Sequence, residues 1–133
     1  MIFTSYFAKI KKFPVNVFPV AICAGVPSWY TGATYSKLAP PYELLMQWKC
    51  DHQNDDYEEC FNDVVLNKLE IIRVLDDLQL LLPDDVRRKM QRPVYDSSDY
   101  HIALVCYEKP TDFCHRHIVA DWLKRNGYKC EEL

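Results

Sequence analysis

The segment 101–106, with the sequence HIALVC, constrains the fold more than any other part of the chain. Its apolar residues follow one another without the alternation of a strand that faces water on one side. A run this short favours a strand over a helix, and strands that are apolar on both faces lie inside parallel sheets. We therefore predict that this segment is the central strand of a largely parallel sheet.

An amphipathic helix is predicted soon after this strand, over the segment 112–127. Four apolar residues recur there at helical spacing and predict one buried face. They are Ile118, Val119, Trp122 and Leu123. The pair Asn126-Gly127 is typical of a helix end, and the segment 128–133 after it predicts a short final strand. A strand, a loop, a helix and a strand in this order indicate an α/β protein.

The rest of the chain fits the same class. Strands are predicted over 1–7 and 15–23, where Pro19 favours an edge or a strand start. Helices are predicted over 42–50, 54–69 and 70–82, with Asn54 or Asp55 as the cap of the second. The polar segment 83–100 is predicted to be part helix and part loop. We expect one domain, 1–133, with a small Rossmann-like, three-layer α/β fold around a mostly parallel central sheet.

Composition excludes several classes of function. The formal net charge of −3 gives no electrostatic reason to bind duplex nucleic acid, which needs clustered Lys and Arg. No targeting signal is visible, and the longest apolar run is far shorter than the ~20 residues that span a bilayer. We therefore expect a cytoplasmic protein without a membrane partner. In that reducing compartment the six cysteines are expected to be free thiols.

The loop YEKPTDF, 107–113, is the predicted site, because ligands of open α/β sheets bind beyond the carboxyl ends of the strands. A helix start adds free N–H groups that favour an anion, and the Arg116 guanidinium adds a fork for phosphate or carboxylate. We expect Arg116 to hold the anion and Lys109 to lie at the same site. Asp112 is the alternative partner of Arg116, and a good N-cap.

Three side chains are candidates for catalysis: Glu108, Cys114 and His115. A thiol at a helix start has a lowered pKa and can act as a nucleophile. Glu108 would orient or deprotonate a substrate group, and His115 would donate or accept a hydrogen bond. The alternatives are a cysteine that only packs at the helix entry and a Glu108–Lys109 pair in solvent.

A metal site is an alternative interpretation of four residues whose side chains zinc accepts as ligands: Cys106, Cys114, His115 and His117. Their spacing lacks a paired knuckle, and residues 115 and 117 of a helix point in different directions. We therefore expect no metal and no cofactor, with Cys106 and His117 near the ligand. A glycine-rich phosphate loop and the C-x5-R loop of cysteine phosphatases are both absent.

The loop 24–42 carries three aromatic residues, Trp29, Tyr30 and Tyr35. They are expected to stack on a planar base, as aromatic rings do in nucleic-acid sites. A loop that only packs over the core is the alternative.

The segments TSYFAKIKKFP, WYTGATYSKLAP and CYEKPTDFCHRHIVADWL resemble the domain of unknown function 488 family, a group of small bacterial and phage proteins. The resemblance runs through most of the chain, and the segment 81–98 looks less typical. It implies a compact, intracellular Rossmann-like α/β domain in which the Cys-x-Glu-Lys and Cys-His-Arg groups share one site. It supplies no reaction.

The preferred hypothesis is a protein that binds a phosphate-bearing or otherwise anionic ligand, most simply a nucleotide or nucleic-acid component. An enzyme that also acts on this ligand, with Cys114 or Glu108 as the reactive group, is a further version of it. A protein-interaction or inhibitor module from a mobile element, without catalysis, is the alternative. A third interpretation is purely structural: a turn held together by a Glu108–Arg116 ion pair and packed cysteines.

Overall fold

The computed structural model describes residues 1–133 and contains one five-stranded sheet in which every neighbouring pair is parallel. The strands are β1 (Ile2–Tyr6), β2 (Val17–Ala21), β3 (Ala33–Thr34), β4 (His101–Cys106) and β5 (Cys130–Glu132). Their order across the sheet is β3-β2-β4-β1-β5. The predicted α/β class with a parallel sheet is therefore confirmed, and β4 is the central strand, as its continuous apolar character indicated.

Pro19 was predicted to lie near an edge or at a strand start. It lies in the middle of β2, which is the neighbour of the edge strand β3, and the short β3 pairs only with Val20 and Ala21. The side of β2 next to Pro19 is therefore open to other groups, and the Tyr30 hydroxyl donates a hydrogen bond to the Pro19 carbonyl oxygen there (3.2 Å). A proline without an N–H group fits such a position.

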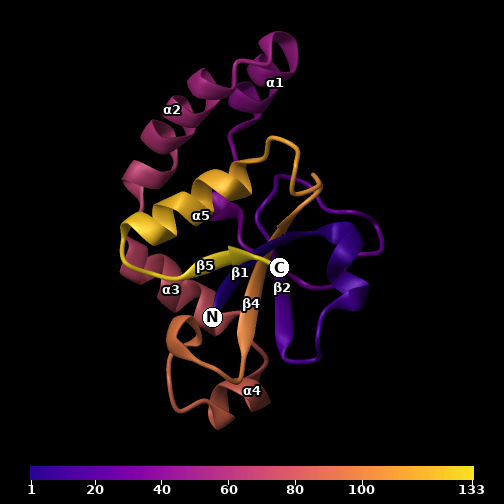
Figure 1. The fold of residues 1–133 in the computed structure, drawn as a ribbon, viewed down its shortest axis with the longest axis vertical. Coiled ribbons are helices and arrows are strands. Elements are labelled where there is room, and N and C mark those ends of the chain that lie inside the picture. The colour runs from indigo at the N-terminus through magenta and orange to yellow at the C-terminus, as the bar shows by residue number, and fades with distance from the viewer.

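Five α-helices join or cover these strands (Figure 1). They are α1 (Tyr42–Asp51), α2 (Asn54–Val64), α3 (Ile71–Leu80), α4 (Asp84–Lys89) and α5 (His115–Arg125). Short 3-10 helices are η1 (Phe7–Lys12), η2 (Ser36–Leu38), η3 (Leu66–Lys68) and η4 (Val94–Asp96). Figure 1 shows α1 and α2 reaching beyond the end of the sheet at which β4 finishes, whereas α4 lies at the opposite end. No helix is long and apolar enough to cross a membrane.

The two ends of α5 show where local sequence predicted the helix boundary correctly and where it did not. Gly127 has φ 89°, the Gly127 N–H group donates to the Lys124 oxygen, and the Tyr128 N–H group donates to the Leu123 oxygen. This is a Schellman ending, as the Asn-Gly pair predicted. At the other end the N-cap is Cys114, not Asp112, which is exposed. The cap of α2 is likewise Gln53, not Asn54 or Asp55, because Asn54 Oδ1 instead accepts a hydrogen bond from Trp48 Nε1.

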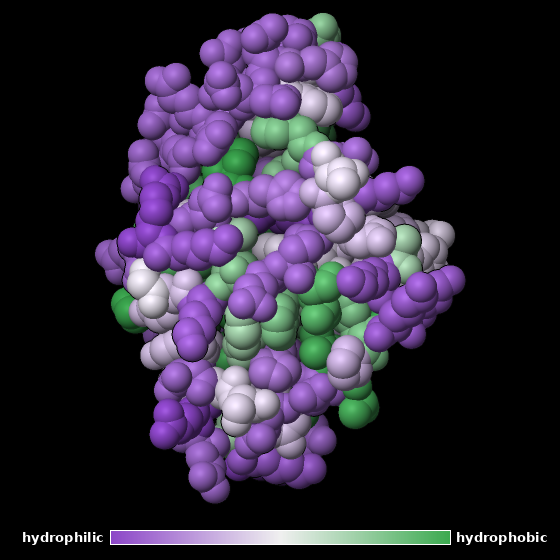
Figure 2. Space-filling model, viewed as in Figure 1, coloured by the Kyte–Doolittle hydropathy of each residue, from purple (hydrophilic) through white to green (hydrophobic).

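A core of 31 buried residues connects the sheet with α2, α3 and α5. Ile102 to Cys106 are each fully buried, so β4 is covered on both faces. Figure 2 shows hydrophobic residues gathered in the middle of the viewed face, over the strands, and polar residues around the α1–α2 end. The carboxyl end of β4 thus lies between the buried sheet and a polar end formed by two helices.

Candidate functional site

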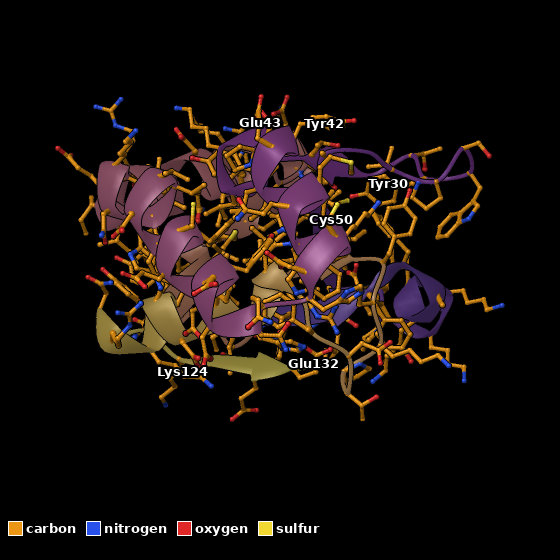
Figure 3. All side chains as sticks on the ribbon, turned by 90° about the horizontal axis from the view of Figure 1, so that it is seen from above. Tyr30, Tyr42, Glu43, Cys50, Lys124 and Glu132 are labelled. Atoms are coloured by element: carbon orange, nitrogen blue, oxygen red, sulfur yellow. The ribbon has the colours of Figure 1, made fainter.

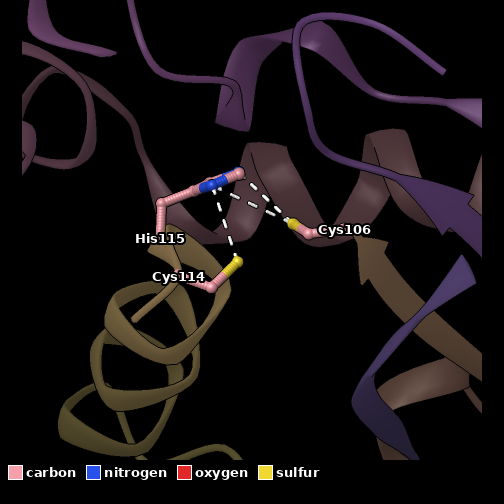
Figure 4. Close-up of side chains that lie close together, drawn as sticks. All are labelled: Cys106, Cys114 and His115. Atoms are coloured by element: carbon pink, nitrogen blue, oxygen red, sulfur yellow. Dashed lines mark hydrogen bonds between the residues drawn. The ribbon is translucent and has the colours of Figure 1, made fainter. Parts of the chain in front are cut away.

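Three side chains meet at the point where β4 ends and α5 begins (Figure 4). Cys106 is the last residue of β4, Cys114 is the N-cap of α5, and His115 is the first helical residue. Their sulfur and nitrogen atoms lie within 4.8 Å of one another, and all three residues are buried. The seven-residue loop 107–113 returns the chain to the strand end, so Cys106 and the residues that begin α5 share one cluster.

The two thiols of this cluster differ in acidity. The S–H group of Cys106 donates to Cys114, and the His115 side chain and the Arg116 N–H group add to the stabilisation of the Cys114 thiolate, so that its pKa falls to about 3. Burial and the negative charge of Cys114 raise the pKa of Cys106 well above its usual range. The two cysteines therefore carry one negative charge between them, and the thiolate is Cys114, the residue at the helix start.

The orientation of His115 is fixed from the opposite side. Its Nε2–H group donates to the backbone oxygen of Ile22, just after β2, at 2.6 Å. The Nδ1 atom lies 3.9 Å from Cys114 Sγ, and Cys106 Sγ lies 3.9 Å from Nδ1 and 3.6 Å from Nε2, so the ring faces both sulfur atoms. A histidine held by a carbonyl on one side and facing a thiolate on the other can stabilise that thiolate or exchange a proton with it.

Arg116 was predicted to hold a ligand anion, but its side chain is fully buried and already paired. Its Nε and Nη2 atoms donate to the two carboxylate oxygens of Glu132 on β5, at 3.2 and 3.0 Å. Nη1 donates to the backbone oxygen of Glu108 at 2.7 Å. The burial of the guanidinium acts to lower its pKa, yet Glu132 and the nearby cysteines raise the pKa overall. Arg116 is therefore a positioning residue that ties the site loop and α5 to β5, and its partner is the Glu132 side chain, not that of Glu108 or Asp112.

Glu108 brings a carboxyl group to Cys114. Both residues line a cavity of about 30 Å³ beside the cluster. Loss of hydration raises the pKa of Glu108, and the neighbouring charge on Cys114 raises it further. The pKa values of the Cys114 thiol and the Glu108 carboxyl group are thus shifted in opposite directions, a pattern found where one group is a nucleophile and the other a proton donor. Lys109, the next residue, is exposed and does not enter this cavity.

Sequence reasoning missed the aromatic walls of this cavity. They come from Trp48 on α1, Tyr57 on α2 and Phe113 in the loop. Trp48 stacks on Phe113 with 5.3 Å between ring centroids, and Tyr57 meets Phe113 edge to face at 5.1 Å. Trp48 and Tyr57 also line a larger cavity of about 250 Å³ between α1 and α2. Their helical spacing in the sequence indicated buried faces, but nothing indicated that these faces cover the end of β4.

The remaining candidates lie apart from the cluster. Tyr35 is buried and donates to Asp77 on α3 at 2.7 Å, so it belongs to the core. Trp29 and Tyr30 pack against Phe7 at the edge of the same end of the sheet. His117 does not join the cluster, and its Nε2 atom is buried without a hydrogen-bond partner. Of the nitrogen-bearing candidates, only His115 faces the thiols.

The cluster could hold a soft divalent ion with Cys106, Cys114 and His115 as three donors. Thiolate and imidazole donors suit zinc, and a histidine that binds zinc donates its other N–H group to a carbonyl or carboxylate, as His115 does to Ile22. A fourth donor would come from Glu108 or water in the cavity. The spacing argument against a knuckle-type site therefore does not exclude an ion, because the fold supplies the proximity that the spacing lacks.

Comparison with protein families finds one match. Residues 23–127 match the family model DUF488-N3a, described as the "Active DUF488-N3 subclade". Comparison with curated proteins and with solved structures found no match. The matched range covers most of the chain and includes all three residues of the cluster, Cys106, Cys114 and His115. The chain belongs to the domain of unknown function 488 family.

Proposed function

We propose that this protein is an enzyme that acts on a nucleotide component, with Cys114 as its nucleophile and Glu108 as its proton donor. One observation carries the proposal: a buried thiol at a helix start faces a histidine ring and shares a cavity with a carboxyl group. The description of the matching subclade as active agrees with catalysis and names no reaction.

In this scheme the Cys114 sulfur forms a bond to an electron-poor carbon of the substrate. The electron pair displaced from that carbon takes a proton from the Glu108 carboxyl group. His115 remains anchored to Ile22 O and faces the sulfur throughout, which keeps the charge on Cys114 before attack. Cys106 donates its S–H group to the same sulfur and so restricts the direction from which a substrate can approach.

A planar, base-like substrate is favoured by the walls of the two cavities. Trp48, Tyr57 and Phe113 offer aromatic faces next to the thiol, and such faces bind planar rings by stacking. The cavity at Cys114, about 30 Å³, has room for a water molecule and not for a base. Substrate entry therefore requires Phe113 or α1 to move, which would join this space to the larger cavity on the other side of Trp48 and Tyr57.

Alkylation kinetics test the proposal directly. Iodoacetamide is added to the folded protein at pH 6, and each cysteine is followed by peptide mass spectrometry. We expect Cys114 to react at least about tenfold faster than exposed Cys50, although Cys114 is buried, because the lowered pKa of Cys114 makes it a thiolate at that pH. Faster reaction at Cys50 would refute the nucleophile.

A Cys106→Ala variant supplies the matched test of the environment. It removes the S–H donor, so the pKa of Cys114 should rise and the pH profile of its alkylation should move to higher pH. Cys60→Ala, a thiol on α2 outside the cluster, is the control and should leave the profile unchanged.

Zinc binding is the second candidate, favoured by the proximity of three donor atoms within 4.8 Å. Metal analysis of protein purified without chelator decides between the two. One equivalent of zinc, lost in Cys106→Ala, would assign the cluster to a metal, and would also protect Cys114 from alkylation. Protein free of metal with a fast Cys114 would support the nucleophile.

A further inference from the structure

The charges of this chain are unevenly distributed along its length. Residues 1–42 contain four lysines and no Asp or Glu, so all 19 acidic residues lie between 43 and 133. Three of the four lysines belong to η1, which follows β1 directly. Lys11 and Lys12 are exposed and form no ion pair, whereas Lys37 pairs with Asp77. The η1 region is therefore a positive surface on a protein whose net charge is negative.

Aromatic rings, two of them exposed, contact the first residue of η1. Phe7, the first residue of η1, is buried and meets three rings edge to face: Trp29 at 6.2 Å, Tyr30 at 5.2 Å and Tyr107 at 4.9 Å. Trp29 is 58% exposed and Tyr107 is 52% exposed. Trp29 and Tyr107 are thus two large, exposed aromatic side chains that contact the same buried ring, Phe7. Together they form a patch of the kind that marks a binding surface.

This patch has a rigid base. The Tyr30 hydroxyl donates to the carbonyl oxygens of Ala33 (2.5 Å) and Pro19 (3.2 Å), which fixes the loop between β2 and β3. A Cβ atom at Gly32 would lie 2.5 Å from the Tyr30 hydroxyl, so the loop closes tightly around this ring. In Figure 3 the loop that carries Tyr30 lies beside η1, and the contact between Phe7 and Tyr30 joins the two segments.

Two segments of backbone connect the patch with the Cys114 cavity. Tyr107 lies between Cys106 of the cluster and Glu108 of the cavity wall. Trp29 lies in the loop between β2 and β3, which begins at Ile22, the residue whose oxygen accepts the His115 hydrogen bond. Exposed Lys109 follows two residues after Tyr107 and adds a further positive charge beside the cavity.

We propose that Trp29, Tyr107, Lys11, Lys12 and Lys109 bind single-stranded nucleic acid. Open rings stack on unpaired bases without regard to sequence, and lysines spaced around them neutralise the phosphates between those bases. A duplex hides its base faces and needs many more cations than this surface offers. Single-stranded nucleic acid is then the class of molecule that would bring a base to Cys114. This inference rests on the proposed function only for the chemistry that follows binding.

Fluorescence anisotropy with labelled single strands of about 12 nucleotides, DNA and RNA, tests this inference. Three phosphate contacts predict a slope of about −2 for log affinity against log salt, or roughly a 20-fold loss between 50 and 200 mM. A Lys11→Gln/Lys12→Gln variant should reduce the slope to about −0.7, and Trp29→Ala should weaken binding at least about fivefold. Both changes are on the surface, and circular dichroism checks that the variants fold.

The control is Lys89→Gln/Lys129→Gln, which removes the same charge from exposed lysines of α4 and of the residue before β5. This variant should bind like the original protein. An equal loss in both lysine variants would show a general charge effect and overturn the inference. So would absence of saturable binding, equal affinity for duplex, or binding to anionic lipid vesicles without binding to the oligonucleotides.

The alkylation rate of Cys114, measured without nucleic acid, separates this inference from the proposed function. Oligonucleotide binding with a slow Cys114 would keep the surface and remove the nucleophile. A fast Cys114 without oligonucleotide binding would do the reverse.

Discussion

The Arg116–Glu132 pair allows a prediction in which the two partners are not equivalent. The Arg116 side chain has no exposed surface, whereas that of Glu132 is 27% exposed. Glu132→Gln leaves a buried guanidinium without its counter-charge, and removing one partner of a buried pair costs about 3–5 kcal/mol. The Gln amide oxygen can still accept one hydrogen bond, so we expect a loss below this range, about 2–3 kcal/mol.

Arg116→Met should cost less, about 1–2 kcal/mol. Methionine fills much of the same volume, and the Glu132 carboxylate that remains can be hydrated and keeps its hydrogen bond from Thr4 (2.7 Å). The Glu108 carbonyl oxygen loses its donor in this variant, which accounts for part of the cost.

Urea denaturation followed by circular dichroism measures both variants. Glu132→Gln should lower the midpoint by between about 1 and 2 M with little change in m. Arg92–Asp96 is the matched control, because its side chains are 70% and 60% exposed and exposed pairs contribute about 0–1 kcal/mol. A Glu132→Gln midpoint as close to the original as that of Asp96→Asn, or a larger loss from Arg116→Met, would refute this account of the pair.

Three further predictions concern the cluster and the fold. The pKa of Cys114 is about 3 in the fold and 9.0 for an ordinary thiol, so between these values the unfolded chain holds a proton that the folded chain has released. The free energy of unfolding of the original protein, relative to Cys114→Ser, should therefore increase with pH, and urea titrations at pH 5, 6.5 and 8 should reveal that slope. Thiolate absorbance near 240 nm should be present at pH 6 and absent in Cys114→Ser; equal spectra would contradict the assignment of the charge. Gly127→Ala should cost about 1 kcal/mol by thermal unfolding, from φ 89° alone, since a Cβ atom there would meet nothing within 4 Å.

The elements that local sequence predicted are those whose signal lies within a few residues. The unbroken apolar run of β4, the buried stripe of α5 and the Asn-Gly ending each depend on neighbours in the chain. The parallel sheet followed from the order of these elements. The prediction of a candidate site at the β4–α5 junction came from the rule for open sheets, and the structure brings Cys106, Cys114 and His115 together there.

What could not be predicted depends on contacts between distant residues. Nothing near Arg116 shows that Glu132 will be its partner, because the pair forms only when β5 aligns beside β1. The support of His115 is a backbone oxygen of Ile22, a group that every residue has. Tyr35 and Trp29 are both aromatic residues of the same predicted loop, so local sequence does not distinguish them. Tyr35 is nevertheless buried in the core and Trp29 is exposed, since the chain between them folds back as β3.

The position of β1 in the sheet has a consequence for how the molecule is made. Its neighbours are β4, which begins at His101, and β5, which begins at Cys130. A ribosome adds about 5–20 residues per second, so several seconds pass between the synthesis of β1 and that of β4, the first of its two partners. The sheet cannot close before β4 and β5 have been made, and its parallel pairings between distant segments make folding slow. Cys106 and Cys114 are made together with these last elements, so their thiols come together only when the strands and the helix that bury them can also assemble.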